Sequence, residues 1–139
     1  MSAKPEKEKD DSSTASKVIG LNKAEFLEKV FNYEKNPNEW VYEGDKPCII
    51  DFYATWCPPC KKQAPIIEQL AKEYEGKIVF YKVDTDKEPE LAKTFNVQGL
   101  PSLLFVPAEG KPTIAAGFKS KAEMVKLIND LILAKKTAE

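Results

Sequence analysis

The stretch CIIDFYATWCPPCKKQAP, which runs from Cys48 to Pro65, constrains the fold of this chain more than any other. Its first seven residues are apolar at both alternating positions apart from Asp51, which is typical of a strand covered on both faces. The following residues predict a helix to about Gly76, because apolar side chains recur on one helical face: Ile67, Leu70, Ala71 and Tyr74. Two cysteines therefore lie between a buried strand and a helix.

The remaining pattern predicts an α/β domain with a partly parallel sheet, because short apolar runs alternate with amphipathic segments from Val18 onward. The expected order is βαβαβαββα, with a central mixed sheet of about five strands and about four helices. Two helices have start signals of the capping-box type, at Asn22 with Glu25 and at Ser120 with Glu123. The runs SLLFVP and TIAAGF flank AEGK as the two strands of a hairpin.

Composition limits the possible functions. The chain has 139 residues, enough for one domain, and a formal net charge of -1, which gives no general signal for nucleic acid. It contains no histidine, which excludes Cys-His nucleophile pairs and histidine metal ligands. The sequence contains no run of 18 apolar residues, so it predicts no membrane-spanning helix. Any reactive cysteine must be activated without histidine.

The first 17 residues mix lysines with acids and contain no aromatic or branched aliphatic side chain. This composition predicts a disordered tail, followed by one domain over residues 18–139. The tail is either a solubilising segment or a spacer left after removal of an export signal or lipid anchor. The first reading predicts a cytoplasmic protein if the chain is complete, and the second predicts a periplasmic or other extracytoplasmic one.

The cysteine pair is placed for redox chemistry. A helix that begins at Cys57 directs its unpaired N–H groups and the positive end of its dipole at that sulfur, which stabilises a thiolate. Pro58 and Pro59 suit the first turn of a helix, where the N–H groups that they lack would have no partner. Cys60 lies within reach of the first sulfur and can close a disulfide with it. A zinc or Cu(I) site is the alternative, but the chain offers one further cysteine as a ligand, Cys48.

Asp51 lies inside the apolar run, so either face of the strand buries it. Burial raises the pKa of a carboxyl group because it disfavours the charged form. We therefore expect Asp51 to accept the proton of Cys60 when that thiol becomes a nucleophile. The alternative is an ordinary surface acid at the end of a strand.

Together these motifs resemble the thioredoxin family. The segments DFYATWCPPCK, YKVDTDKEPELA and QGLPS, the proline at Pro65 and the glycine of AAGF occur in that family's order, over Val18 to Ala134. The resemblance implies the thioredoxin fold. It also implies a site in which Cys57 attacks, Cys60 resolves, Trp56 shields the pair, and two residues lie beneath it: Asp51 and Lys82.

The resemblance further implies that Pro101 is a cis-proline facing the cysteines, although trans is the usual state of X-Pro bonds. The backbone of Leu100 could then bind an extended substrate segment in the manner of an added strand. Gly99 and Gly117 would permit a close approach of that backbone. Tyr53 is expected in the core. In contrast to the family's commonest motif, Pro58 replaces a glycine and cannot donate a hydrogen bond to sulfur.

The implied function is a thiol-disulfide oxidoreductase that reduces or exchanges protein disulfides through a mixed disulfide and needs no bound cofactor. A thioredoxin reductase or a membrane thiol reductase would supply electrons, and the protein is expected to be a monomer. Alternatives on the same fold are a disulfide oxidase or isomerase and a redox-inert binding or metal-handling module. Cys48 is expected to be a buried, inert residue.

Overall fold

The computed structural model describes residues 16–134. Its centre is a mixed five-stranded sheet in the order β1-β3-β2-β4-β5. The strands are β1 (Val18–Gly20), β2 (Cys48–Tyr53), β3 (Val79–Asp84), β4 (Ser102–Val106) and β5 (Thr113–Ala116). β3 is parallel to β1 and β2, whereas β4 is antiparallel to both β2 and β5. β2, the strand whose sequence predicts cover on both faces, is the central strand of this sheet.

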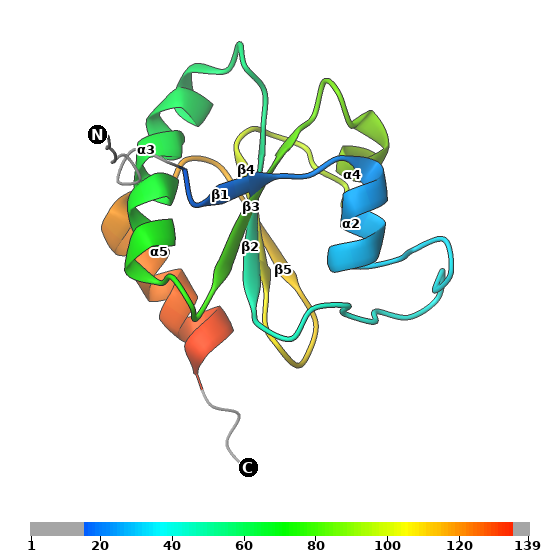
Figure 1. The fold of residues 1–139 in the computed structure, drawn as a ribbon. Coiled ribbons are helices and arrows are strands. Elements are labelled where there is room, and N and C mark those ends of the chain that lie inside the picture. Colours follow the sequence, from blue (N-terminus) through cyan, green and yellow to red (C-terminus); the bar gives the residue numbers. More distant parts are fainter. Residues whose placement is uncertain (1–15, 135–139) are drawn as a thin grey trace, which may run out of the picture.

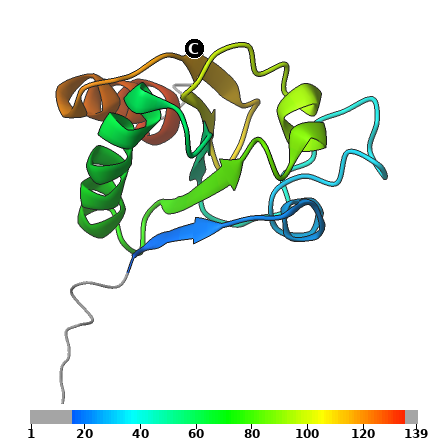
Figure 2. The ribbon, with the colours of Figure 1, turned by 90° about the horizontal axis from the view of Figure 1, so that it is seen from above.

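Four α-helices cover the two faces of the sheet, and the predicted element order is confirmed. They are α2 (Lys23–Lys29), α3 (Pro58–Glu73), α4 (Pro89–Thr94) and α5 (Lys121–Ile128). Figures 1 and 2 show α3 and α5 on one face and α2 and α4 on the other. α5 continues into a π-helical turn, η1 (Asn129–Leu133), which the side-chain pattern did not indicate.

Both predicted capping boxes are present. The Asn22 side chain accepts a hydrogen bond from the Glu25 N–H at 2.8 Å, and the Glu25 side chain accepts one from the Asn22 N–H in return. Ser120 and Glu123 form the same reciprocal pair at the start of α5. Each pair satisfies backbone donors that a helix start leaves without partners, which fixes where these helices begin.

Side-chain alternation along β2 divides the core into two layers. Ile50 and Phe52 pack in the cluster under α2 and α4, which also contains Phe26. Ile49 packs in the cluster under α3 and α5, which also contains Leu70. Residues two apart on a strand share a face, so Asp51 is directed to the same side as Ile49, toward α3. This is the side on which the cysteine pair lies.

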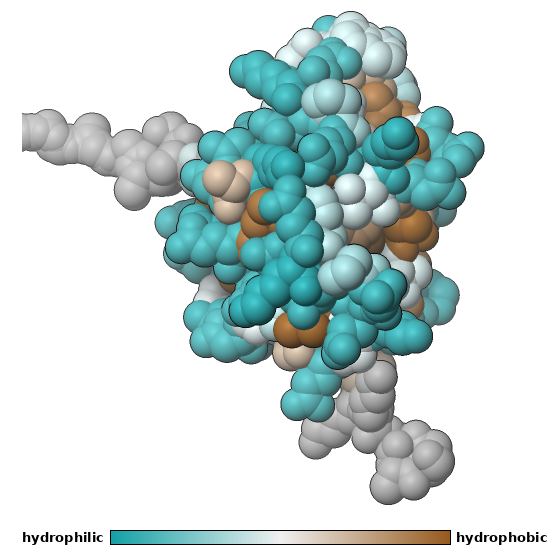
Figure 3. Space-filling model, turned by 90° about the vertical axis from the view of Figure 1, so that its right-hand side faces the viewer, coloured by the Kyte–Doolittle hydropathy of each residue, from teal (hydrophilic) through white to brown (hydrophobic). Residues whose placement is uncertain are grey.

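The predicted tail lies largely outside the described residues, as do residues 135–139. Of its last two residues, Ser16 donates a hydrogen bond to Glu68 on α3 at 2.6 Å, and Lys17 forms an exposed ion pair with Glu75. Within residues 16–134, no helix is both long and apolar enough to cross a membrane. The face shown in Figure 3 is mainly hydrophilic, with hydrophobic residues in separate patches.

Candidate active site

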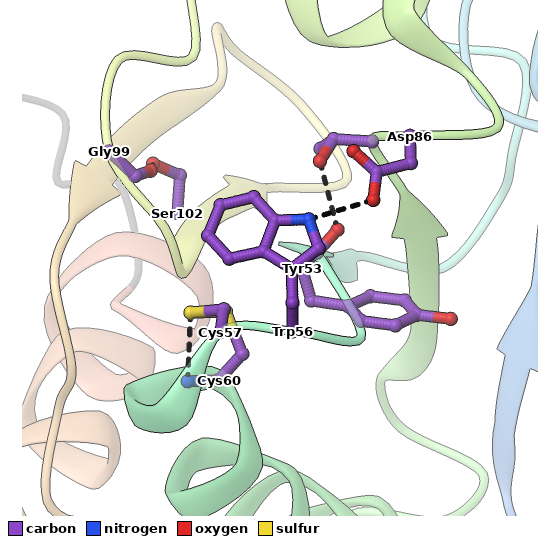
Figure 4. The surroundings of a disulfide bond; sticks show 8 residues. Tyr53, Trp56, Cys57, Cys60, Asp86, Gly99 and Ser102 are labelled. Atoms are coloured by element: carbon purple, nitrogen blue, oxygen red, sulfur yellow. Dashed lines mark hydrogen bonds between the residues drawn. A yellow bond between two sulfur atoms is a disulfide. The ribbon is translucent and has the colours of Figure 1, made fainter.

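Cys57 and Cys60 form a disulfide, with their Cα atoms 5.2 Å apart. Cys57 is the N-cap residue of α3, and its sulfur accepts a hydrogen bond from the Cys60 N–H at 3.2 Å (Figure 4). Pro58 and Pro59 occupy the first two helical positions and have no N–H to offer. The Cys60 N–H is thus the first backbone donor of the helix, and it is directed at Cys57.

Exposure does not distinguish the two cysteines, because each is 3% exposed in the disulfide form. They form a small cluster with Ala54, against which Tyr53 and Leu100 pack. What separates the two sulfurs is their position relative to α3, since Cys57 caps the helix and Cys60 lies within its first turn. Tyr53 is half-buried rather than fully in the core.

Asp51 is buried as predicted, with 5% of its surface exposed. Burial raises the pKa of its carboxyl group from 3.8 to about 7, and the positive charge of Lys82 acts in the opposite direction. The Oδ1 atom of Asp51 is buried without a hydrogen-bond partner. Lys82 lies in register with Asp51 on the adjacent strand β3, so the structure brings these two residues together as expected.

Trp56 is a large apolar side chain that is 65% exposed. Its indole Nε1 donates a hydrogen bond to the Asp86 carboxylate at 2.8 Å, and Figure 4 shows its ring beside the cysteine pair. The Asp86 N–H in turn donates to the Asp84 side chain at 3.0 Å. No local pattern singles out Asp86, because its partner lies 30 residues away in the sequence.

The segment on the other side of the cysteines contains Pro101, and the Leu100–Pro101 peptide bond is cis. The Pro101 carbonyl accepts a hydrogen bond from the Gly117 N–H at 2.8 Å. Gly117 has a φ of 94°, a left-handed conformation that favours glycine. A Cβ atom on Gly99 would meet nothing within 4 Å, so no packing within the described residues requires glycine there.

Sequence reasoning missed Gln63, a fully buried amide on α3. Its Nε2 donates to the Lys119 carbonyl at 3.0 Å, and its Oε1 accepts from the Lys119 N–H at 2.8 Å. The signal was available, because Gln63 falls on the same helical face as Cys60 and Ile67, where an apolar residue is expected. A polar residue at such a position needs a buried partner.

The comparisons with known proteins agree with this site. The family model described as Thioredoxin matches residues 17–130. The chain belongs to the thioredoxin family. It is 50% identical to a thioredoxin of Borreliella burgdorferi over 113 residues, which are 81% of this chain and 96% of that one.

Two further relatives support the same placement. A chloroplastic M-type thioredoxin of Spinacia oleracea is 49% identical over 67 residues, which are 48% of this chain and 37% of the relative. The crystal structure of chloroplastic thioredoxin z superposes with a TM-score of 0.69 at 26% identity, covering 85% of this chain and 96% of the other. The chain has the thioredoxin fold, and its C-x-x-C pair makes it a thiol-disulfide oxidoreductase.

Proposed function

We propose that this protein is a disulfide reductase or exchange enzyme for other proteins, with Cys57 as its attacking sulfur. The observation that carries the proposal is the hydrogen bond from the Cys60 N–H to the Cys57 sulfur at the start of α3. In the reduced protein the same donor and the helix dipole favour a thiolate over a thiol. A thiolate is the form of cysteine that attacks disulfides.

The reaction has two steps. The Cys57 thiolate attacks one sulfur of a substrate disulfide, forming a mixed disulfide and releasing the other substrate sulfur as a thiolate. The Cys60 thiol then loses its proton and attacks the Cys57 sulfur, which closes the Cys57–Cys60 disulfide and releases the second substrate thiolate. The substrate gains two electrons, and the enzyme dithiol loses them.

Asp51 is the proposed acceptor of the Cys60 proton. A carboxyl group whose pKa lies at about 7 is partly ionised at neutral pH and can both take and return a proton. Its unpaired Oδ1 leaves an oxygen available for that proton. Lys82 has a supporting role, because its charge limits the upward shift of the Asp51 pKa.

The proposed substrate surface surrounds the cysteine pair. Trp56 provides an exposed apolar platform on one side, and the backbone of Leu100 provides hydrogen-bonding groups for an extended segment on the other. Pro101 with its neighbours Gly99 and Gly117 forms the rest of this surface. Recognition through backbone groups would place few demands on the substrate's sequence.

Turnover needs a source of two electrons for the oxidised enzyme. We propose a flavin-dependent thioredoxin reductase or a membrane thiol reductase as the partner class. The first fits a cytoplasmic protein and the second an extracytoplasmic one, which would apply if residues 1–17 are a spacer. No resident cofactor is required, since sulfur exchange conserves electrons between the two dithiols.

The test is insulin reduction with dithiothreitol as the reductant. We expect Cys57→Ser to remove the enzymatic rate, and Cys60→Ser to retain substrate proteins as covalent complexes that thiols release. The matched control is the double variant Cys57→Ser/Cys60→Ser, which should retain none. Equal insulin reduction by the native chain and Cys57→Ser would refute the proposal.

An equilibrium titration against glutathione distinguishes the reductase from an oxidase or isomerase. A reductase is expected to have a potential of about -270 mV, whereas that of an oxidase is about -120 mV. A potential above the cytosolic glutathione poise would therefore reverse the proposed direction. Catalytic inertness of the intact dithiol would favour a binding or metal-handling module.

A further inference from the structure

The connection between α2 and β2 is the longest irregular segment that the structure describes. It runs over residues 30–47 and contains no helix or strand. Figure 1 shows it beside α2, on the side of the sheet away from α3. Connections longer than about 15 residues are uncommon in a compact domain and usually have a function of their own. The cysteine pair does not explain this one, because that pair follows the opposite end of β2.

A hollow of about 730 Å³ lies between this connection and the loop that joins β4 to β5. Its lining includes three aromatic side chains of the connection and one lysine of the loop: Phe31, Trp40, Tyr42 and Lys111. In the sheet, Val106 at the end of β4 is paired with Cys48 at the start of β2. This distal hollow therefore lies at the end of the sheet opposite the cysteine pair, and a segment bound in it would not cover that pair.

The three aromatic side chains form one continuous surface in the wall of the distal hollow. The Trp40 and Tyr42 rings are nearly parallel, with 8° between their planes and 6.4 Å between their centroids. The centroid of the buried Phe31 ring is 4.5 Å from that of Trp40. Grooves lined by aromatic rings are the sites at which SH3 and WW domains bind proline-rich segments in the extended polyproline II conformation.

Trp40 also has a hydrogen-bond donor without an acceptor. Its indole Nε1 is buried and has no hydrogen-bond partner within residues 16–134. A buried donor of this kind costs free energy, so a ligand acceptor that reaches it is favoured. The other tryptophan of the chain, Trp56, already donates to Asp86. A polyproline II segment supplies acceptors, because its carbonyl groups form no internal hydrogen bonds.

Hydrogen bonds hold this aromatic surface in place before anything binds. The Tyr42 hydroxyl donates to the Lys46 carbonyl, and the Glu43 N–H donates to the Val30 carbonyl at 2.8 Å. Gly44 permits Tyr42 to lie against the backbone, because a Cβ atom there would be 2.6 Å from the Tyr42 hydroxyl oxygen. A surface whose side chains are already fixed loses less conformational entropy when it binds a partner.

Two charges of opposite sign also line the distal hollow. Glu39 lies in the connection and Lys111 in the β4–β5 loop, so each belongs to one wall. Both side chains are exposed, and neither forms an ion pair within residues 16–134. A segment with one basic and one acidic residue complements these charges, whereas a segment of a single sign is repelled by one of them.

We propose that the distal hollow binds a proline-rich segment of another protein, with one basic and one acidic residue beside the prolines. The proline rings pack on the aromatic surface, and a carbonyl group of the segment accepts from the Trp40 N–H. The two charged residues of the segment pair with Glu39 and Lys111. The site holds the other protein beside the enzyme while the cysteine pair stays uncovered. Binding involves no redox step, so it is independent of the proposed function.

The test is an NMR titration of the isotope-labelled full chain with a blocked synthetic peptide of prolines and leucines that has a lysine at one end and a glutamate at the other. The chain has 2 tryptophans, so its spectrum contains one indole N–H signal for each, and Trp56→Phe assigns them. We expect the Trp40 signal to shift downfield as its N–H gains an acceptor, and the Trp56 signal to stay. A glycine-serine peptide with the same two charges is the matched control ligand and should shift neither signal.

Substitutions separate the contacts. Trp40→Phe keeps an aromatic ring but removes the N–H, and it should lower the affinity about fivefold. Lys111→Gln should lower it about threefold, but only for the peptide that carries the glutamate, because it removes one exposed ion pair. Lys62→Gln on α3 removes another exposed lysine and should bind the peptide as the native chain does. If Trp40→Phe does not fold, Lys111→Gln and the uncharged peptide carry the same test.

Several results would overturn the proposal. An unshifted Trp40 signal at about 1 mM peptide, or an equal shift with the control peptide, would show that the hollow does not recognise prolines. A shift of the Trp56 signal alone would assign the peptide to the cysteine site. Self-association of the native chain that Trp40→Phe removes would assign the hollow to a second copy. Insulin reduction by Lys111→Gln should stay within about twofold of the native rate, which separates this proposal from the proposed function.

Discussion

Two cysteines, one at the first residue of β2 and one shortly after its last, differ in the surroundings of their sulfur atoms. At the first end, Cys48 is completely buried, and burial raises the pKa of its thiol to about 12. Just beyond the other end, Cys57 caps a helix and receives a backbone hydrogen bond. Cys48 is 0% exposed, and Cys57, within its disulfide, is 3% exposed. The extent of burial therefore does not distinguish the two cysteines. At Cys48 a hydrogen bond with Tyr42 lowers the pKa of the thiol, but burial outweighs it. At Cys57 the start of a helix adds a dipole and a backbone donor that favour a thiolate.

The largest expected effect is in alkylation of the reduced protein. At pH 7 we expect iodoacetamide to label Cys57 at least about a thousandfold faster than Cys48, because the buried thiol is almost entirely protonated. Mass spectrometry of timed samples measures both sites in one reaction. Labelling in denaturant serves as the control and should remove the difference. Comparable labelling rates of Cys57 and Cys48 in the native state would contradict the expected difference in their reactivity.

Asp51, between these ends, predicts a pH-dependent stability. Its pKa is raised from 3.8 to about 7 in the folded state, so folding favours the protonated form. The wild-type protein therefore loses up to about 4 kcal/mol of unfolding free energy as the pH rises from 4 to 8. Asp51→Asn should lack this loss in urea titrations. The exposed Asp130→Asn is the control, and its pH dependence should match that of the wild type.

The same substitution should slow the second chemical step. We expect Asp51→Asn to lower the rate of mixed-disulfide resolution about tenfold to a hundredfold at pH 7, because the Cys60 proton has no nearby acceptor. Stopped-flow measurements with a substrate disulfide follow the release of the second thiol. The pH profile should lose the ionisation near 7 while the initial attack by Cys57 continues. An unchanged profile would remove Asp51 from the mechanism.

The smallest expected effect is at Cys48. Cys48→Ala should lower the free energy of unfolding by about 1 kcal/mol, as the loss of a small core group does, with activity within about twofold of the wild type. Cys48→Ser keeps nearly the same volume but places a hydroxyl group in the core, so it should lose more. Urea denaturation and insulin reduction measure the two quantities. A large loss of activity in both variants would give Cys48 a role in catalysis.

The features that the sequence predicts are those with a signal among neighbouring residues. β2 was recognisable because both of its faces are apolar, and the starts of α2 and α5 were recognisable because a cap and its partner lie three residues apart. Asp51 was recognisable because any orientation buries it. Each of these signals is local.

The missed contacts join distant parts of the chain. Trp56 and Asp86 are 30 residues apart, and Gln63 and Lys119 are 56 apart. Their pairing depends on how the sheet brings loops together, and no local pattern encodes it. Gln63 was nevertheless visible as a polar residue on an apolar helical face, without any indication of its partner.

The most direct test of the account is the pH dependence of Cys57 alkylation in the reduced protein. We expect the rate to reach half its maximum between about pH 3.5 and 7.5, the range of cysteines at helix starts. Cys60→Ser isolates the Cys57 signal, and Cys48 serves as the unreactive internal reference. Half-maximal labelling at about pH 8.5, the pKa of a free cysteine, would contradict the claim that the start of α3 activates this sulfur.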